Sequence, residues 1–317
     1  MMNNPAPPEI SVIVAAYNAA QTLERCVKSI QEQSLSGFEI IISDDKSQDG
    51  TLELAEKLAQ QDRRIKIIAK AENSGPAGAR NAALDIARGE WIAIVDSDDS
   101  IAPDRFEKMR RVADKTGADI IFDNLVFHPA GESEGYPYLP DTLTIFGPLR
   151  FETYAASSTI SNPLPNLGFL KPVCRRSLIE QNKIRYDETL RIGEDSLIVF
   201  ELFAAGAKAW LMPETFYHYY KNKNSISAVF DSEKICNMAD ALDLFVKNKG
   251  EKLDAGARTA VESLEKDLRL RLKARETFGD MGFENIRKSC ALALKDKESR
   301  LYLYRELRHQ IKKMIKK

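Results

Sequence analysis

Residues 91–99 read WIAIVDSDD: five uncharged residues, most of them β-branched or aromatic, followed by three carboxylates within four positions. The apolar run predicts a buried strand of a parallel sheet. Carboxylates this close repel one another unless a cation lies among them, and Mg²⁺ and Mn²⁺ take carboxylate oxygens while leaving positions open for substrate phosphates. The stretch therefore predicts a metal-bound phosphate ligand at Asp96, Ser97 and Asp98. The alternative is an acidic turn that caps the next helix.

This strand is the fourth of a series of strand-like runs that are separated by helical patterns. The runs are residues 10–16, 38–43, 65–69 and 91–96, and helices are expected at 20–33, 51–61 and 79–87. The repeated βαβ pattern predicts an α/β fold with a mostly parallel sheet covered by helices on both faces. Ligands of such sheets bind at the carboxyl ends of the strands, so the loops that follow the strands form the candidate site.

A dinucleotide-binding domain would need a glycine-rich turn directly after its first strand. Here that turn, residues 16–20, reads AYNAA and has no glycine. The loop at residues 73–78 has two glycines, but it follows the third strand. The sequence therefore disfavours nicotinamide or flavin binding.

The chain of 317 residues has a net charge of −1, which is unevenly distributed. Residues 1–230 carry −7 and residues 231–317 carry +6, which indicates a basic appendage on an acidic core. No apolar run approaches the ~18 residues of a membrane span, and residues 1–8, expected to be a flexible tail, lack the features of a signal peptide. The four cysteines form no CxxC pair, so we expect a cytoplasmic protein with reduced thiols.

Four loop motifs occur in order along the first third of the chain. They are AYN at 16–18, DDKSQDGT at 44–51, GPAGARN at 75–81 and DSDD at 96–99, the last followed by Pro103. In this combination the chain resembles the family 2 inverting glycosyltransferases, which have the GT-A fold and use a nucleotide-sugar donor. The similarity is clear from residue 9 to about 110 and looser to about 228. It implies a GT-A domain at 9–230, with a nucleotide-sugar half (9–110) and an acceptor half (111–230), and a helical C-terminal region at 231–317.

The resemblance assigns nucleotide-binding roles to residues at the first strand ends. Asp45 would accept the N–H of a uracil or similar base, and Ala15 and Tyr17 would lie at the nucleotide. Arg80 would lie near it too, since its fork suits a base carbonyl or a phosphate. The structural alternatives are a plain turn residue for Asp45, edge packing for Tyr17 and an exposed helix residue for Arg80.

The resemblance also implies a divalent metal, Mn²⁺ or Mg²⁺, as the cofactor. Asp96 would lie toward the ribose and the metal, with Ser97 beside it, and Asp98 would bind the metal that bridges the two phosphates. His218 could be a third metal ligand, although a histidine in an aromatic strand is more often a packed core residue.

Residues 192–200 read IGEDSLIVF, so two adjacent carboxylates open an otherwise apolar helix. An acidic helix cap is the structural alternative. By resemblance, Asp195 is the general base that takes the proton of the acceptor hydroxyl, and Glu194 orients it or contacts the acceptor. The sequence leaves open which carboxylate has which role.

Two further stretches belong to the acceptor half. Residues 128–168, with Tyr136, Tyr138 and Phe146, are rich in proline and glycine. We expect a long irregular segment there, either an acceptor-binding insertion or a disordered loop. Residues 217–225 read YHYYKNKNS, and by resemblance Lys221, Lys223 and Ser225 would donate to phosphate oxygens.

The predicted function is inverting transfer of a sugar from a nucleotide-sugar, preferably a UDP-sugar, to a carbohydrate hydroxyl. By resemblance, the acceptor is a polysaccharide or a lipid-linked oligosaccharide of the cell surface. One alternative is a sugar-1-phosphate nucleotidyltransferase, although residues 16–21 lack its glycine-rich phosphate loop. The other is an inactive nucleotide-sugar or carbohydrate-binding module, which would be expected to lose Asp45, Asp98 or Asp195.

Residues 300–317 hold seven Lys or Arg and one acid, and their apolar residues recur at helical spacing. Such a basic amphipathic helix suits peripheral binding to an anionic membrane, here the inner face of the cell membrane. It could instead pack on the core or pair two subunits of a homo-oligomer. Nucleic acid is not expected as a partner, because the rest of the chain is acidic and has no recognition motif.

Overall fold

The computed structural model describes residues 7–131, 134–159, 162–222 and 231–278, with the backbone alone at 274–278. The chain forms two compact units. The first runs to residue 150 and resumes from 168 to 228, and the second comprises 151–167 and the chain from 229. Within the described residues, no helix combines the length and the apolar character that crossing a membrane requires.

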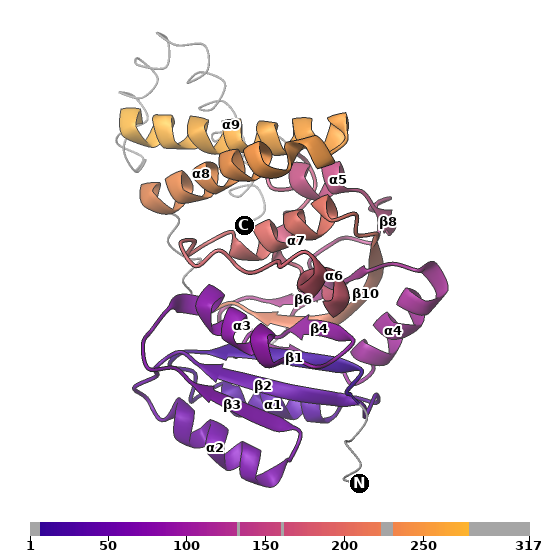
Figure 1. Ribbon diagram of the computed structural model, residues 1–317, viewed down its shortest axis with the longest axis vertical. Helices are drawn as coiled ribbons and strands as arrows, with labels where there is room; N and C mark the ends of the chain where they lie inside the picture. The colour runs from indigo at the N-terminus through magenta and orange to yellow at the C-terminus, as the bar shows by residue number, and fades with distance from the viewer. Residues whose placement is uncertain (1–6, 132–133, 160–161, 223–230, 279–317) are drawn as a thin grey trace. The chain divides into compact units, whose positions relative to one another are not determined.

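A single mixed sheet is the centre of the first unit (Figure 1). In the described residues its order is β3-β2-β1-β4-β9-β6-β10-β5, with β7 added to β6 and β8 to β10. The longer strands all run in one direction; they are β1 (Ile10–Ala16), β2 (Phe38–Asp44), β3 (Ile65–Ala69), β4 (Trp91–Ile94), β6 (Ile120–His128) and β10 (Ala209–Tyr220). The short strands run against their neighbours; they are β5 (Ser100–Ile101), β7 (Tyr136–Pro137), β8 (Gly147–Leu149) and β9 (Val173–Arg175). The predicted α/β fold with a mostly parallel sheet is confirmed.

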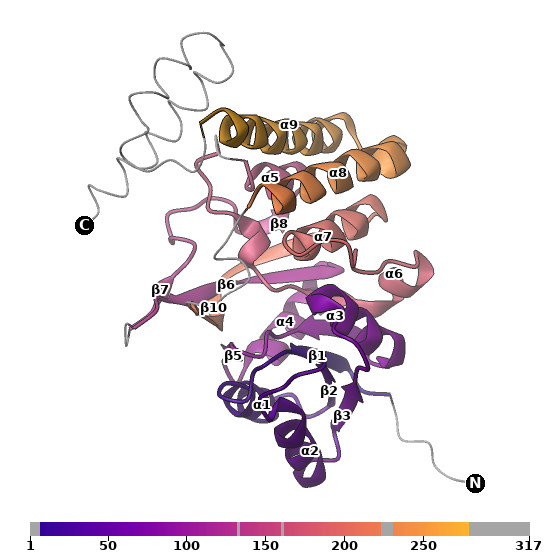
Figure 2. The same ribbon diagram turned by 90° about the vertical axis from the view of Figure 1, so that its left-hand side faces the viewer.

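The helices of the first unit connect these strands and cover the sheet (Figures 1 and 2). They are α1 (Leu23–Gln31), α2 (Thr51–Gln61), α3 (Gly75–Ile86), α4 (Arg105–Thr116), α6 (Arg176–Gln181) and α7 (Glu194–Ala204). Right-handed crossovers place α1 and α2 on one face and α3 on the other. The buried runs ISVIVAA of β1 and FEIIISD of β2 are rich in β-branched residues, as expected of strands covered on both faces.

The strand order creates one crevice at the sheet edge. β1 pairs with β2 on one side and with β4 on the other, so the connections from β1 and from β3 leave in opposite directions. Such a switch in strand order opens a ligand crevice at the carboxyl ends of the strands. The loops after β1, β2 and β4 meet at this edge, and they carry the motifs at 16–18, 44–51 and 96–99.

The second unit is helical. It contains α5 (Phe151–Ala156), α8 (Ser232–Lys249), the short η3 (Gly250–Lys252) and α9 (Ala255–Phe278). Phe151 of α5 contacts Phe245 of α8 edge-on, with ring centroids 6.3 Å apart, and Arg269 of α9 donates to Asp240 of α8 at 2.7 Å. The helical C-terminal region is thus confirmed, whereas the basic helix predicted at 300–317 lies outside the described residues. The domain boundary near residue 230 stays a prediction, and residues 151–167 join the second unit.

The structure corrects two local predictions. Helix α3 begins at Gly75 rather than at residue 79, because the Asp45 carboxylate accepts the backbone N–H groups of Ser74 and Gly75 and Pro76 fits the first turn. Residues 128–168 are not irregular throughout, since they include β7, β8 and α5. Their prolines and glycines hid these short elements from a reading based on periodicity.

A buried ion pair joins α4 to β6 in the core. Arg105 donates to both Asp123 oxygens at 2.9 Å, and both side chains are 0% exposed. Removing one partner of such a pair leaves a buried charge uncompensated.

We predict that Asp123→Asn lowers the free energy of unfolding by about 3 kcal/mol, because the Arg105 charge loses its counter-ion in the core. Urea unfolding followed by circular dichroism measures this. The matched control is Asp114→Asn, which removes an exposed i, i+4 pair with Arg110 and should change stability by less than about 0.5 kcal/mol. Equal stability of Asp123→Asn and the wild type would show that the pair is not buried as described.

Candidate functional site

The loop after β4 carries the acidic stretch, and β10 holds this loop in place. Tyr217 accepts the Asp96 backbone N–H at 3.1 Å and donates its hydroxyl to Asp99 Oδ2 at 2.7 Å. The other Asp99 oxygen accepts the Tyr220 backbone N–H at 2.9 Å. Asp99 therefore ties the loop after β4 to β10 and does not cap α4, as the acidic-turn alternative would require. Its burial and the neighbouring Asp96 and Asp98 raise its pKa well above the usual range.

The other two carboxylates of this loop, Asp96 and Asp98, have opposite surroundings. Burial alone would raise the pKa of Asp96, but ion pairs with Lys171 (2.8 Å) and Arg80 (2.9 Å) outweigh it and hold this pKa well below the usual range. Burial and the nearby Asp96 charge raise the pKa of Asp98. Among the described residues no side chain forms an ion pair with the Asp98 carboxylate. Asp96 is thus neutralised by the protein, and Asp98 is the carboxylate with charge left to offer.

Two buried cations connect Asp96 to the start of α7. Arg80 of α3 donates hydrogen bonds from one terminal guanidinium nitrogen to Glu194 (2.9 Å) and Asp195 (2.7 Å) and from the other to Asp96. Lys171 lies 2.5 Å from Asp195 and 2.8 Å from Asp96. We call these five residues, Arg80, Asp96, Lys171, Glu194 and Asp195, the ion network. Burial would lower the pKa of both cations, but the carboxylates raise the pKa of Arg80 and of Lys171 well above the usual values.

The first turn of α7 presents both predicted catalytic carboxylates to this network. Gly193 precedes the helix with φ 91°, a backbone conformation that suits glycine. Carboxylates in a first turn also face the positive end of the helix dipole. Burial and the adjacent Asp195 raise the pKa of Glu194, which is 8% exposed. The structure therefore brings together Asp96, Arg80, Glu194 and Asp195 from three predicted motifs.

Lys171 is the residue of the ion network that the sequence did not single out. Its carbonyl accepts the Arg105 guanidinium at 2.5 Å, so the buried Arg105–Asp123 pair fixes its backbone. The available signal was a lone lysine within the apolar run 169–173, FLKPV. A lysine is seldom buried unless its charge is paired.

The loops after β1 and β2 are joined by side-chain hydrogen bonds. Asn18 N–H donates to Ser47 Oγ at 2.9 Å, and Gln48 N–H donates to Asn18 Oδ1 at 2.9 Å. Tyr17, at the same turn, is 50% exposed. Ala15 pairs with Ser43 on β2, one residue before the end of β1. Tyr17 therefore presents an open ring at the crevice, as a base-packing role requires, and this role stays a prediction.

Asp45 lies at the crevice but is engaged by the backbone of its own fold. One oxygen accepts the Ser74 N–H (2.9 Å) and hydroxyl (3.1 Å), and the other accepts the Gly75 N–H (2.7 Å). Asp45 thus caps α3 in the structure. Contact with a base would use the remaining lone pairs of the same carboxylate, and this role also stays a prediction.

Of the residues predicted on β10 and after it, His218 and Lys221 contact His128 of β6. His218 Nδ1 is 3.1 Å from His128 Nε2, the rings stack, and burial and His128 lower the pKa of His218. Lys221 is exposed and donates its backbone N–H to the His128 carbonyl at 2.9 Å. Lys223 and Ser225 lie outside the described residues. In the part of the chain that the structure describes, no three His, Cys, Asp or Glu side chains are grouped to hold a metal.

The donor set nevertheless suits a metal that is shared with a phosphate ligand. Mg²⁺ and related ions are usually held by one or two carboxylates together with substrate phosphates, and not by a cage of protein ligands. Asp98 supplies one such carboxylate, with a raised pKa and no ion pair to any described side chain, and Asp96 lies two residues away. The residues present therefore fit a divalent metal.

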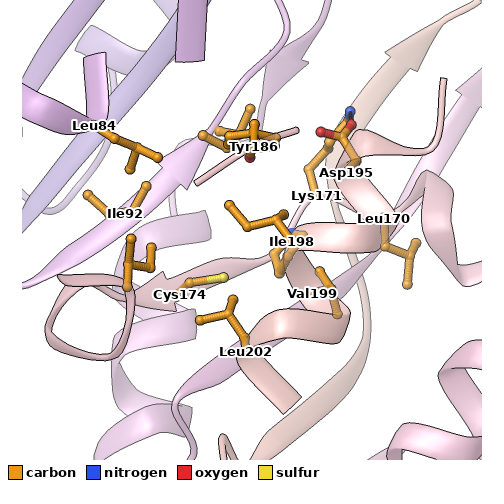
Figure 3. A pocket seen from close by; sticks show the side chains of 13 residues that line it. Leu84, Ile92, Leu170, Lys171, Cys174, Tyr186, Asp195, Ile198, Val199 and Leu202 are labelled. Atoms are coloured by element: carbon orange, nitrogen blue, oxygen red, sulfur yellow. Dashed lines mark hydrogen bonds and ion pairs between the residues drawn. The ribbon is translucent and has the colours of Figure 1, made fainter. Parts of the chain in front are cut away.

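An apolar cavity lies behind the ion network. It has a volume of about 30 Å³ and is lined by side chains of α3, β4, β9 and α7, with Lys171 and Asp195 at one end (Figure 3). Burial raises the pKa of Cys174 in this lining to about 12, so the thiol stays protonated. The apolar surroundings strengthen ion pairs at their boundary because water cannot screen them there.

Comparison with known proteins shows which family the sequence matches. The model of the family described as Glycosyl transferase family 2 matches residues 11–179. The succinoglycan biosynthesis protein ExoO of Rhizobium meliloti (strain 1021) is 35% identical over 249 residues, which cover 78% of this chain and 71% of that protein.

Two solved structures have a similar fold. The first is S. aureus TarS 1–349 in complex with UDP-GlcNAc, with a TM-score of 0.63 and 21% identity over 84% of this chain and 72% of that one. The second is the mannosyltransferase PcManGT from Pyrobaculum calidifontis in complex with GDP-Man and Mn²⁺, with a TM-score of 0.60 and 18% identity over 96% of this chain and 85% of that one. The GT-A fold that the motifs implied is confirmed.

The sharing of Lys171 between Asp96 and Asp195 leads us to predict how a substitution at this lysine changes the affinity for Mn²⁺. Lys171→Met removes a positive charge that Asp96 shares, so the acidic loop should bind Mn²⁺ about tenfold more tightly, a change of ~1.4 kcal/mol. Isothermal titration with MnCl₂ measures this, and Lys171→Arg should stay near the wild type.

The matched control is Lys66→Met, which removes a lysine paired with Glu39 on β2 and should leave the Mn²⁺ affinity unchanged. Unchanged or weaker Mn²⁺ binding by a folded Lys171→Met protein would contradict the shared charge.

Proposed function

The chain belongs to glycosyl transferase family 2, and we propose that it transfers a sugar from a UDP-sugar to a carbohydrate hydroxyl with inversion. The observation that carries the proposal is the ion network. It joins Asp96, at the donor end of the crevice, to Asp195, at the start of α7, through the same two cations. Inversion requires a donor and a base on opposite sides of one carbon. In this proposal the loop of Asp96 would serve the donor and Asp195 would serve the acceptor.

A UDP-sugar is the proposed donor because the crevice suits a nucleotide with a diphosphate. Tyr17 offers an exposed ring for the base, and Asp45 offers a carboxylate for the N–H of uracil. Arg80 stays with its carboxylates in this scheme and acts on the nucleotide only indirectly. Support also comes from TarS, whose structure contains UDP-GlcNAc, whereas PcManGT contains GDP-Man.

The proposed cofactor is Mn²⁺ or Mg²⁺ held by Asp98, with Asp96 beside it and the diphosphate completing its coordination. When bound, such an ion offsets the negative charge that develops on the departing diphosphate. Asp98 would hold it because, among the described residues, no side chain forms an ion pair with this carboxylate, while Lys171 and Arg80 pair with Asp96. The presence of Mn²⁺ in the PcManGT structure supports this cofactor.

Asp195 is the proposed general base. As the bond between the acceptor oxygen and the anomeric carbon forms, the bond from that carbon to the diphosphate breaks, and the acceptor proton passes to Asp195. Lys171 and Arg80 would hold the carboxylate in place before the reaction. Glu194, whose pKa is raised by burial and by Asp195, would orient its neighbour through Arg80.

We further propose a saccharide acceptor of a cell-surface polysaccharide, free or linked to a lipid. The relative ExoO is named for succinoglycan biosynthesis, which supports this setting. Binding of residues 300–317 to an anionic membrane, and pairing of subunits through them, remain proposals from the sequence. Membership of the glycosyltransferase family argues against a nucleotidyltransferase, and the presence of Asp45, Asp98 and Asp195 argues against an inactive module.

A panel of nucleotide-sugars tests the donor. With Mn²⁺ and no acceptor, we expect slow release of UDP from one UDP-sugar and little or no release from GDP- and ADP-sugars. Luminescent detection of the released nucleotide measures this.

Asp98→Asn is the control for the donor panel. It replaces a charged ligand by a neutral one, so donor and metal binding should weaken together. Absence of binding and of release for every nucleotide-sugar would argue against the proposed function, and wild-type turnover of Asp98→Asn at limiting Mn²⁺ would remove Asp98 from the metal site.

The base is tested by Asp195→Asn. This variant should bind UDP normally and lose kcat for transfer by ~10²–10⁴-fold, because proton removal contributes about that much. Transfer to a saccharide acceptor, followed by product chromatography, measures kcat, and titration calorimetry measures UDP binding.

Asp187→Asn is the matched control, because Asp187 lies in a polar turn where it accepts from the Thr189 N–H and hydroxyl. It should keep nearly full activity. Equal losses at positions 187 and 195 would point to a folding defect and not to general-base catalysis.

A further inference from the structure

Five aromatic side chains gather on the first unit and take no part in the ion network. They are Phe127 of β6, Tyr136 of β7, Tyr138 just after it, Phe169, and Tyr219 of β10. We call this group the aromatic platform. Phe127 stacks on Tyr219 with centroids 5.5 Å apart and contacts Tyr136 at 5.6 Å. Phe169 joins the other side, with its ring edge-on to Tyr219 (6.2 Å) and to Tyr138 (5.8 Å).

The platform is open to solvent at both ends. Tyr136 is 53% exposed and Phe169 is 39% exposed. Large apolar side chains that are exposed singly are ordinary on a protein surface. A connected group of aromatic side chains with exposed members is less common and marks a binding surface more often.

The fold fixes the positions of Tyr136, which is exposed, and of Tyr138, which is half-buried. A side chain at Gly135 would place its Cβ 2.5 Å from Val126 Cγ1, so only glycine lets β7 lie this close to β6. Buried Asn124 then holds Leu139, donating to its carbonyl at 2.8 Å and accepting its N–H at 2.9 Å. Tyr136 and Tyr138 are therefore held on a rigid support. A surface that is ordered before its ligand arrives loses less conformational entropy on binding.

Two members of the platform are close in the chain to residues of the proposed active site. Phe169 is two residues from Lys171, which contacts Asp195, and Tyr219 is two residues from Tyr217, which holds the loop of Asp96 and Asp99. Two extended residues span at most about 7 Å. The backbone at Phe169 and at Tyr219 is therefore within about 7 Å of residues that position the proposed site.

We propose that the aromatic platform binds the sugar rings of the acceptor next to the one that is glycosylated. This deepens the proposed function and rests on it. Aromatic faces accept the apolar C–H faces of pyranose rings, while tyrosine hydroxyls at the rim meet the sugar hydroxyls. Three of the five rings are tyrosines, so the surface is apolar in its faces and polar at its edges. This composition fits a saccharide better than an alkyl chain, which would be matched by aliphatic side chains.

Saturation-transfer NMR tests the platform with the full chain and a panel of neutral tetrasaccharides: cellotetraose, laminaritetraose, maltotetraose and chitotetraose. We expect transfer to the ring protons of at least one of them. Tyr136→Ala and Phe169→Ala should each weaken that binding about tenfold, and Tyr136→Phe should retain it because it keeps the ring. UDP affinity and donor hydrolysis without acceptor should be the same in all variants.

The control is Ile86→Ala, which removes an exposed apolar side chain of α3 (41% exposed) from elsewhere on the same unit and should change nothing. Failure of the wild type to bind any tetrasaccharide would overturn the proposal, as would wild-type binding by both alanine variants. Octyl glucoside separates the ligand chemistries, because transfer to its alkyl protons instead of its ring protons would assign the surface to an apolar chain. If no nucleotide-sugar is hydrolysed, the proposed function fails, and saccharide binding is then judged separately.

Discussion

Two buried cations, Arg80 and Lys171, hold three carboxylates from two separate parts of the chain within hydrogen-bonding distance. Without them Asp96, Glu194 and Asp195 would repel one another in surroundings that screen charge poorly. The cost of burying these charges is offset because each one has a partner of the opposite sign. The same pairs fix where the loop after β4 and the start of α7 can lie, so the electrostatic balance also sets the geometry of the crevice.

Asp98 lies outside the ion network, and this distinguishes it from Asp96 as a candidate metal ligand. Asp96 is paired with Arg80 and Lys171, whereas Asp98, two residues further, forms no ion pair with the described side chains and has a raised pKa. Environments that shift the pKa values of neighbouring carboxylates in opposite directions are typical of functional sites. Tyr217 and Asp99 support this difference between the two carboxylates, because their hydrogen bonds fix the backbone of the loop against β10.

Much of the sheet could be predicted because its signal is local. The runs of β1 and β2 are continuous and β-branched, and the loops after them carry polar motifs in a fixed order. Long-range pairing could not be predicted in the same way. Lys171 lies in a loop without a motif, and the carboxylates that it pairs with come from α7 and from the loop after β4. Asp45 shows the converse, since its motif pointed to the nucleotide while the structure also gives it the start of α3.

Crystals grown with UDP and Mn²⁺, with diffraction measured at the manganese absorption edge, test most directly whether Asp98 holds the metal while the ion network stays intact. We expect one anomalous peak in contact with the Asp98 carboxylate and the UDP diphosphate, while Lys171 and Arg80 still contact Asp195. A manganese peak between His128 and His218, or one that displaces both cations from Asp195, would contradict the arrangement of donor and base described above.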